Sequence, residues 1–281
     1  MESEQEISIR PFEKESDYFV FEALQKEIWG KDIEEVITAS LAKIVQKIGG
    51  IAAGAFDADG TMIGFVFGFP GFMEGKPIHW SHMLAVKPAY RDAGIGKKLK
   101  LYQRGVLLGM GVNEVFWTYD PLAGKNAHLN LNTLGADVVE YVQDMYGSGE
   151  DSILFRGIGT DRFIVVWRIA DEKIKKIIEA KRGIASELFR ASSLAVCRSA
   201  ENDPESFPVN DLDLHDKRVR VEVPDDVHQL MRISIASAAD WRKKTREAFQ
   251  QYLHEGYKVV GFYLDQVSGR CFYCMERLNS N

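Results

Sequence analysis

The feature that most constrains this chain is the stretch at residues 84–98, which reads LAVKPAYRDAGIGKK. It follows an apolar strand predicted over residues 80–86 and leads into a helix predicted over 97–110. Gly94 and Gly96 let the backbone approach a ligand closely. The amides of a helix's first turn have no intrahelical acceptor, and the helix dipole is positive at that end. A phosphate group suits this geometry, and Arg91 and Lys97 add positive charge beside it.

Three kinds of loop compete for this pattern. A Gly-x-Gly pair alone would favour an ordinary strand-to-helix turn. A P-loop is excluded, because Gly94 and Gly96 are too close together and no Gly-Lys-Ser/Thr follows. A dinucleotide-binding loop is excluded, because Leu99 stands where the third glycine is needed. The full stretch, Arg-x-x-Gly-x-Gly after a strand ending in Leu-Ala-Val, resembles the coenzyme A pyrophosphate loop of the GNAT superfamily of N-acyltransferases.

The resemblance implies a set of cofactor contacts. In the GNAT fold the strand before the loop and the strand after its helix, here residues 80–86 and 114–119, splay apart and leave backbone amides to be satisfied. Pantetheine would then add along Leu84 and Val86. The diphosphate would lie on residues of the loop and the helix start: Arg91, Ala93, Gly94, Ile95, Gly96 and Lys97. Asn126, at the start of a later helix, either binds pantetheine or caps that helix.

A second local match is more particular and lies in residues 117–163. It consists of WTYDPL at 117–122, Asn126-Ala, Asn130-Leu, Leu134-Gly-Ala, Tyr146-Gly and Thr160-Asp-Arg-Phe. These segments resemble one branch of the superfamily, known mainly as predicted acyltransferases. Some members of that branch are amino-acid N-succinyltransferases encoded beside N-acylamino-acid racemases.

The order of predicted elements is that of a mixed α/β fold. Periodicity and turn signals give the order β-αα-β-β-β-α-β-α-β-β over about residues 5–170, a mixed, splayed sheet flanked by helices and also the GNAT order. The strands fall at residues 7–12, 51–56, 62–69, 80–86, 114–119, 136–141 and 162–169, and the helices at 17–29, 34–48, 97–110 and 126–134. Residues 69–77 are predicted as a loop. We therefore predict an acyltransferase domain over residues 1–170.

The remaining residues predict a smaller α/β extension. Residues 171–217 are expected to form a linker helix and a polar connection, and residues 218–281 a strand-helix-hairpin unit. Its long helix carries Arg242 and Arg246 one turn apart, where they could clamp a carboxylate of an amino-acid acceptor or a succinyl donor. A solvated basic face beside Lys243 and Lys244 is the alternative.

Acyl transfer to an amine needs a base, and two residues are candidates. Alternation places Trp80, His82 and Leu84 on one face of the central strand, so His82 is the preferred base. A packed, hydrogen-bonded histidine is the other interpretation. Asp120, which follows residues 114–119, is the alternative base, or else caps the turn before the next helix.

The departing thiolate also needs a proton. Many GNAT relatives carry a tyrosine where this chain has Leu131. The donor is then Tyr141, Tyr146 or a water, and Tyr146, in a Met-Tyr-Gly loop, is preferred. A core tyrosine is the alternative interpretation of both.

Composition excludes several classes of protein. The 281 residues carry 46% hydrophobic residues and a net charge of −6, which argues for an ordinary globular protein without nucleic-acid partners. The N-terminus lacks an apolar signal core, and no segment is long and apolar enough for a membrane span. Cys271 and Cys274 lie in a predicted strand, so we expect them to be structural rather than a zinc or redox site. A cytoplasmic location follows.

The sequence thus predicts a CoA-dependent N-acyltransferase with acetyl-CoA or another acyl-CoA as co-substrate and no metal. It would move an acetyl or succinyl group directly to a primary amine of a small molecule such as an amino acid. A peptide or protein N-acetyltransferase and a non-catalytic acyl-CoA sensor are the alternatives. The oligomeric state is left open, with a homodimer as one option.

Overall fold

The computed structural model describes residues 7–31, 35–147, 157–180, 189–199, 207–265 and 268–278. Contacts between α-carbons divide the chain into two compact units. The first comprises Met1–Trp117 and Arg168–Asp171, and the second Thr118–Trp167 and Glu172–Asn281. This division differs from the boundaries predicted at 170 and 217, because residues 118–167 group with the C-terminal part of the chain.

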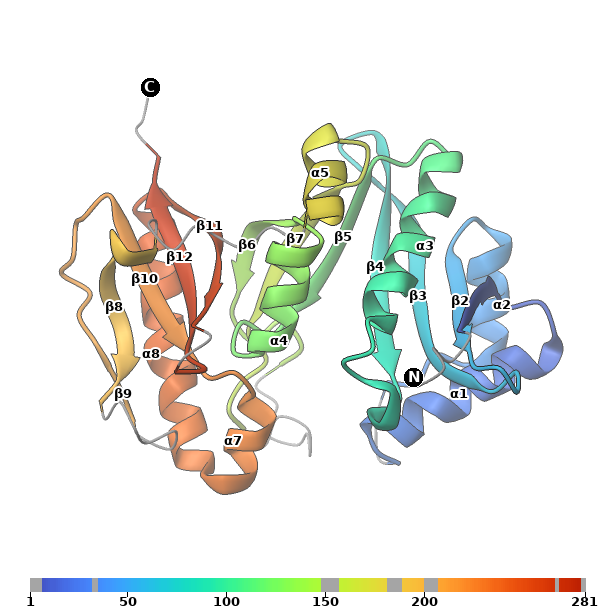
Figure 1. Ribbon diagram of the computed structural model, residues 1–281, viewed down its shortest axis with the longest axis horizontal. Helices are drawn as coiled ribbons and strands as arrows, with labels where there is room; N and C mark the ends of the chain where they lie inside the picture. Colours follow the sequence, from blue (N-terminus) through green and yellow to red (C-terminus); the bar gives the residue numbers. More distant parts are fainter. Residues whose placement is uncertain are drawn as a thin grey trace, which may run out of the picture. The chain divides into compact units, whose positions relative to one another are not determined.

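The first unit is built on a sheet whose strands follow the order β1-β2-β3-β4-β5 (Figure 1). β4 pairs antiparallel with β3 and parallel with β5. The strands are β1 (Ser8–Pro11), β2 (Ile51–Phe56), β3 (Met62–Met73), β4 (Lys76–Val86) and β5 (Glu114–Tyr119). The helices are α1 (Glu15–Trp29), α2 (Ala39–Lys47), the 3-10 turn η1 (Pro88–Tyr90) and α3 (Ile95–Gly109).

Helices cover both faces of this sheet. Phe21 of α1 and Val45 of α2 pack in one buried cluster with Phe65 and Phe67 of β3. Val66 lies between those two phenylalanines and points to the opposite face, because side chains alternate along a strand. α3 packs on the sheet through Ile95, Leu99 and Leu107, which are buried but lie outside that cluster.

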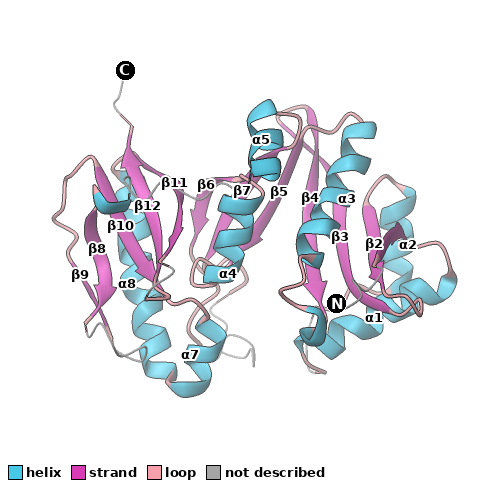
Figure 2. Cartoon of the chain, viewed as in Figure 1, coloured by secondary structure: helices cyan, strands magenta, loops and turns pink. Residues whose placement is uncertain are grey.

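Residues 69–77 form a β-hairpin, so the prediction of a loop there is wrong. β3 and β4 stay paired to Met73 and Lys76, which leaves only Glu74 and Gly75 in the turn (Figure 2). Both turn residues have positive φ, 52° and 76°. A two-residue turn of this kind matches the right-handed twist of the strands it joins. The many Gly and Pro residues there resemble a loop, but their backbone continues the ladder.

The second unit contains a strand pair and a separate five-stranded sheet in the order β11-β12-β10-β8-β9. The pair is β6 (Asp137–Val142) with β7 (Arg162–Arg168), accompanied by the helical segments α4 (Gly124–Ala127), η2 (His128–Thr133) and α5 (Glu172–Ala180). The separate sheet contains β8 (Ser193–Arg198), β9 (Pro208–Asn210), β10 (Arg218–Val223), β11 (Tyr257–Leu264) and β12 (Cys271–Arg277). Helices α7 (Val227–Ile233) and α8 (Ile235–His254) lie between β10 and β11 in the chain.

The predicted fold class, a mixed α/β structure with helices flanking the sheets, is confirmed. The predicted strand-helix-hairpin over residues 218–281 is confirmed as well, and β8 and β9 add two strands that were not predicted. Cys271 and Cys274 both lie in β12 as expected. No described helix combines the length and the apolar character needed to cross a membrane.

Candidate functional site

The loop between β4 and α3 turns the chain through two left-handed residues. Asp92 has φ 63° and Gly94 has φ 74°. Gly94 is the N-cap of α3, and it offers no side chain to cap the helix. The first helical bond runs from Lys98 N to Gly94 O at 3.0 Å. The amides of Gly94, Ile95 and Gly96 therefore precede the helical ladder and are available to a ligand.

The loop is accessible and positively charged. Residues 91–94 are exposed, and a Cβ added at Gly94 would meet no atom within 4 Å. The first turn of α3 contains no acidic residue, whereas Lys97 and Lys98 lie in it. Arg91 donates from Nε to the Val86 carbonyl at 3.2 Å, which fixes its side chain beside the end of β4. An anion can thus approach the helix start from solvent, as the sequence predicts.

The parallel pairing of β4 with β5 is short. It joins His79 to Val115 and Trp80 to Phe116, and β4 continues beyond this point to Val86. On its other edge β4 stays paired with β3 as far as Val86. Leu84 and Val86, the predicted pantetheine contacts, lie in the part of β4 beyond these two pairs.

His82 occupies a β-bulge at the place where this short pairing ends. Ser81 pairs with Gly68 and Met83 pairs with Phe67, so His82 is an extra residue opposite a single step of β3. The prediction that Trp80, His82 and Leu84 share one face is therefore wrong. Across the bulge the alternation of side chains shifts by one residue. Trp80 pairs with Phe69 and Leu84 pairs with Val66, and these two residues of β3 point to opposite faces.

The environment of His82 suits a neutral imidazole. Its ring meets Phe69 edge to face, with 5.4 Å between the ring centroids. Burial lowers the pKa of His82 below its ordinary value, and a weaker effect of Glu35 opposes this. A histidine that stays neutral at neutral pH is in the form that a general base requires.

A buried polar cluster, which was not predicted, joins α3 to β4 and β5. Lys100 of α3 is 1% exposed and donates from Nζ to the Ser81 hydroxyl at 2.7 Å. It also donates to Gln103 at 3.3 Å, and it lies 3.9 Å from the ring centroid of Trp117 in β5. Gln103 in turn contacts the buried ring of His79 at 3.1 Å.

These contacts give Lys100 hydrogen-bond acceptors but no carboxylate. Burial lowers the pKa of Lys100 to about 7. Burial, with a smaller effect of the Lys100 charge, also lowers the pKa of His79 to about 3. The sequence signal was available: Lys100 falls on the apolar face of α3, next to Leu99 and one turn from Gln103.

Asp120, a predicted site residue in the second unit, is paired with two arginines of the same unit. Asp120 is 9% exposed and accepts from Arg242 at 2.6 Å, with Arg162 at 3.6 Å. Burial would raise the pKa of Asp120, but the charges of Arg242 and Arg162 outweigh it and hold the pKa below its ordinary value. A carboxylate so stabilised is a weak base, and its backbone contact with Leu122 fits the predicted capping role.

Arg246 is engaged in the same way. It binds Asp161 at 2.6 and 2.8 Å and Asp144 at 3.1 Å. Asp161 also accepts from the hydroxyl of Tyr141. Arg242 and Arg246 thus attach α8 to Asp120, Asp144 and Asp161 of the same unit. The two arginines bind internal carboxylates, and a substrate carboxylate would have to displace these.

Tyr146 and Asn126 are more accessible. Tyr146 is 46% exposed, and its hydroxyl lies 3.1 Å from that of Thr118. The Arg162 guanidinium lies 5.3 Å from the Tyr146 ring centroid. Asn126 is exposed on α4. Of the two tyrosines, Tyr146 is the exposed one and its hydroxyl contacts Thr118, whereas the hydroxyl of Tyr141 donates to Asp161.

No family model and no curated protein matches this chain. Its structure is similar to solved acetyltransferase structures. One is the NatC complex bound to a Gag peptide and CoA, at 20% identity and a TM-score of 0.46, with 58% of this chain and 98% of that chain covered. A second is the ribosomal-protein-S18-alanine N-acetyltransferase from Escherichia coli, at 15% identity, TM-score 0.47 and coverage of 59% and 97%. A third is aminoglycoside 6'-acetyltransferase type Ii, at 18% identity, TM-score 0.47 and coverage of 59% and 99%.

Proposed function

We propose that this protein is an acyl-CoA-dependent N-acyltransferase. The observation that carries the proposal is the Arg-x-x-Gly-x-Gly loop at the start of α3. Its Gly94 is left-handed with open space before it, and Arg91 and Lys97 lie on either side. The amides of Ala93, Gly94, Ile95 and Gly96 would receive the diphosphate of coenzyme A, which combines backbone donors with the positive end of the helix dipole.

The pantetheine arm would run from this loop back along β4. Beyond Trp80 the parallel pairing with β5 ends, so the amides of pantetheine can bond to the strand edge near Leu84 and Val86. Four residues of strand, from Val86 to His82, span about 13 Å. This path leads the thioester toward the bulge at His82.

His82 would act as the general base. The neutral imidazole accepts a proton from the acceptor amine as its nitrogen attacks the thioester carbonyl carbon. The carbon–sulfur bond then breaks, the acyl group stays on nitrogen, and the thiolate takes a proton from a donor. Tyr146 as the proton donor and Asn126 as a pantetheine ligand stay predictions from the sequence. Asp120, Arg242 and Arg246 are left out of the proposed site because they bind one another or other internal charges.

The acceptor we propose is a primary amine of a small molecule such as an amino acid, and the group transferred to it is acetyl or succinyl. The decisive experiment pairs two measurements on the whole chain. Calorimetric titration with acetyl-CoA, succinyl-CoA and CoA tests binding, and thiol release with a mixture of primary amines tests transfer. Binding without turnover would identify an acyl-CoA sensor, and absence of binding would refute the proposal.

A further inference from the structure

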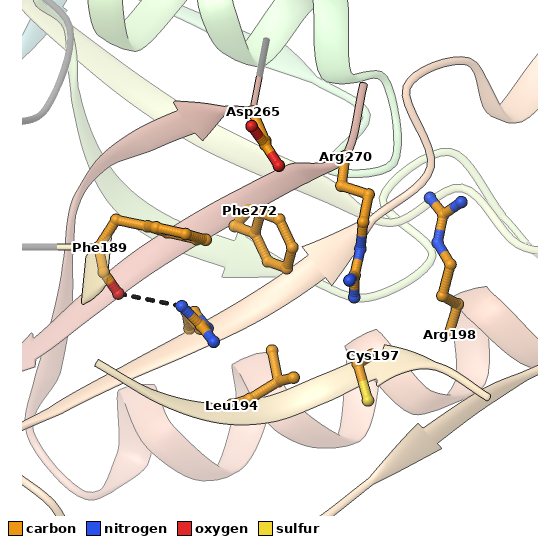
Figure 3. A pocket seen from close by; sticks show the side chains of 8 residues that line it. Phe189, Leu194, Cys197, Arg198, Asp265, Arg270 and Phe272 are labelled. Carbon is orange, nitrogen blue, oxygen red and sulfur yellow. Dashed lines mark hydrogen bonds between the residues drawn. The ribbon is translucent and has the colours of Figure 1, made fainter. Parts of the chain in front are cut away.

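A pocket lies on one face of the five-stranded sheet of the second unit, the face that α8 does not cover. Along β10, Val219, Val221 and Val223 are fully buried, and α8 packs on this strand. Arg220 and Glu222 alternate with these valines and therefore point to the other face. There the strands form a pocket of about 280 Å³ (Figure 3). This volume is close to the lower limit of about 300 Å³ for small-molecule sites.

Aromatic rings make one wall of this pocket. The Phe189 ring stacks on Tyr263 with 4.0 Å between centroids and packs against Phe272 at 5.0 Å. Phe189 and Phe272 both line the pocket, and Figure 3 shows them side by side. Because Tyr263 stacks on Phe189, this ring is held in place, and Phe189 and Phe272 together give the pocket an apolar wall.

Three arginine side chains also line the pocket, those of Arg198, Arg220 and Arg270. Two of them, from Arg198 and Arg270, bind Glu222, which is fully buried. Arg198 donates to this carboxylate from Nε at 2.6 Å and from its backbone N at 3.0 Å. Arg270 donates to it at 3.0 and 2.6 Å. Each oxygen of Glu222 thus accepts two hydrogen bonds, which uses its whole capacity.

The third guanidinium, that of Arg220, forms no ion pair within the described chain. It donates to the Phe189 carbonyl at 3.1 Å and lies 4.4 Å from the centroid of that ring. Its Nε is buried and has no hydrogen-bond partner. A buried donor without an acceptor is costly, so an anion placed here would gain a charge-assisted bond.

The charges of the pocket favour a single negative charge. Asp265 contributes a carboxylate to the lining, and this side chain accepts from the Ser268 hydroxyl at 2.5 Å. Among the described residues at the pocket, three arginines therefore face two carboxylates, Glu222 and Asp265, which gives an excess of one positive charge. A phosphate dianion would exceed this balance, whereas a carboxylate matches it.

We propose that this pocket binds a small organic monocarboxylate whose apolar body packs on Phe189 and Phe272 and whose carboxylate binds Arg220. The site belongs to the second unit and is separate from the proposed acyltransferase loop. Its ligand would be an aromatic or branched carboxylic acid rather than a nucleotide. Neither the coenzyme A site nor the transfer reaction is needed for this binding.

Direct binding tests the proposal. We would titrate the whole chain with phenylacetate and with its neutral amide, phenylacetamide, by calorimetry. Saturable binding of phenylacetate in the millimolar range and at least tenfold weaker binding of the amide are expected. Arg220→Met should abolish the preference for the acid, and Arg220→Lys should keep part of it because the charge remains. No saturable binding of phenylacetate, or equal binding of acid and amide, would overturn the proposal.

Arg218→Met is the matched control. It lies on the same strand, but it binds Glu276 at 3.1 Å and does not line the pocket. This variant should bind phenylacetate as the wild type does. Circular dichroism of each variant shows whether it is folded, so that a loss of binding is assigned to the pocket.

Alkylation of Cys197 gives a second, local readout, because this half-buried thiol lines the pocket. Iodoacetate carries a carboxylate and iodoacetamide does not. The ratio of their rates at Cys197, measured by peptide mass spectrometry, should be several-fold higher in the folded chain than in urea. Phenylacetate should slow the reaction with iodoacetate. A ratio equal to that of the unfolded chain would contradict the proposed anion preference.

Discussion

The Nζ of Lys100 lies 2.7 Å from the Ser81 hydroxyl. Both residues are buried, and Ser81 follows Trp80, which pairs with Phe116 of β5. Within the described chain no carboxylate accompanies it in its hydrogen bonds, and Gln103 is its other acceptor. A buried amine of this kind favours its neutral form. The pair therefore couples the stability of the first unit to pH.

Lys100 is expected to make the protein more stable as the pH rises. Burial lowers the pKa of Lys100 to about 7, whereas an unfolded lysine stays protonated to about pH 10.4. Between these values the unfolded chain binds more protons, so the free energy of unfolding increases with pH. Urea denaturation of wild type and Lys100→Met across this range should show a difference that grows in favour of wild type. Lys98→Met, at an exposed position of the same helix, should show no such trend.

Replacing a glycine of the loop should abolish binding of coenzyme A. Gly94→Glu or Gly96→Glu puts a carboxylate where the diphosphate is proposed to lie, and Gly94 also has φ 74°, which strains any other side chain. Thermal shift with CoA measures the protection. Gly105→Glu is the control, since a Cβ there meets nothing within 4 Å and the position is exposed. Unchanged protection in both loop variants would refute the placement of the diphosphate.

His82→Ala should lower turnover and leave the affinity for CoA unchanged. The proposed role of His82 is to take a proton from the amine, a contribution of roughly 10²–10⁴-fold in rate. Steady-state thiol release gives kcat, and calorimetry gives the affinity for CoA. Normal turnover in this variant would remove His82 as the base, whereas a loss of CoA binding would point to a packing role.

Breaking the pair of Arg242 and Asp120 should destabilise the second unit. Arg242→Met leaves a buried carboxylate whose remaining cation, Arg162, lies 3.6 Å away. The expected loss is about 3–5 kcal/mol in the free energy of unfolding. Urea denaturation at neutral pH measures it, and Arg232→Met, at an exposed position of α7, is the control.

The pair of Arg242 and Asp120 also makes the free energy of unfolding depend on pH in the acidic range. Its charges hold the pKa of Asp120 below the ordinary value, although burial opposes this. The stabilisation is therefore complete above the pKa of an unfolded aspartate, about 3.9, and is lost as the pH falls below it. The difference between wild type and Arg242→Met should shrink on acidification. A constant difference would show that Asp120 does not titrate in this way.

The sequence predicted those features that are local in the chain. β2 falls at Ile51–Phe56, as the apolar run and the following turn signal indicate, and α3 follows the glycine loop directly. The turn from β4 into α3 was predictable because its glycines and its helix start lie within a few residues of one another. Periodicity and turn chemistry are sufficient for such elements.

What the sequence did not predict depends on pairing between distant segments. The bulge at His82 comes from the register of β4 against β3, and alternation alone missed it. The short strand β9 (Pro208–Asn210) has no apolar run that would identify it, and it is formed by pairing with β8. For Arg242 the sequence suggested a carboxylate clamp or a solvated basic face, because nothing local in α8 indicates that Asp120 is its partner.

The attachment of α8 to residues 120–161 has a consequence for how the protein is made. Asp120 and Arg242 are separated by 122 positions, and Asp161 and Arg246 by 85. During synthesis the two aspartates leave the ribosome long before their arginines, and domains generally fold as units when their parts are present. The second unit therefore completes these charge pairs only after α8 has been synthesised. A ribosome stalled before α8 emerges would hold a nascent chain with unpaired carboxylates, a state open to chaperones and proteases.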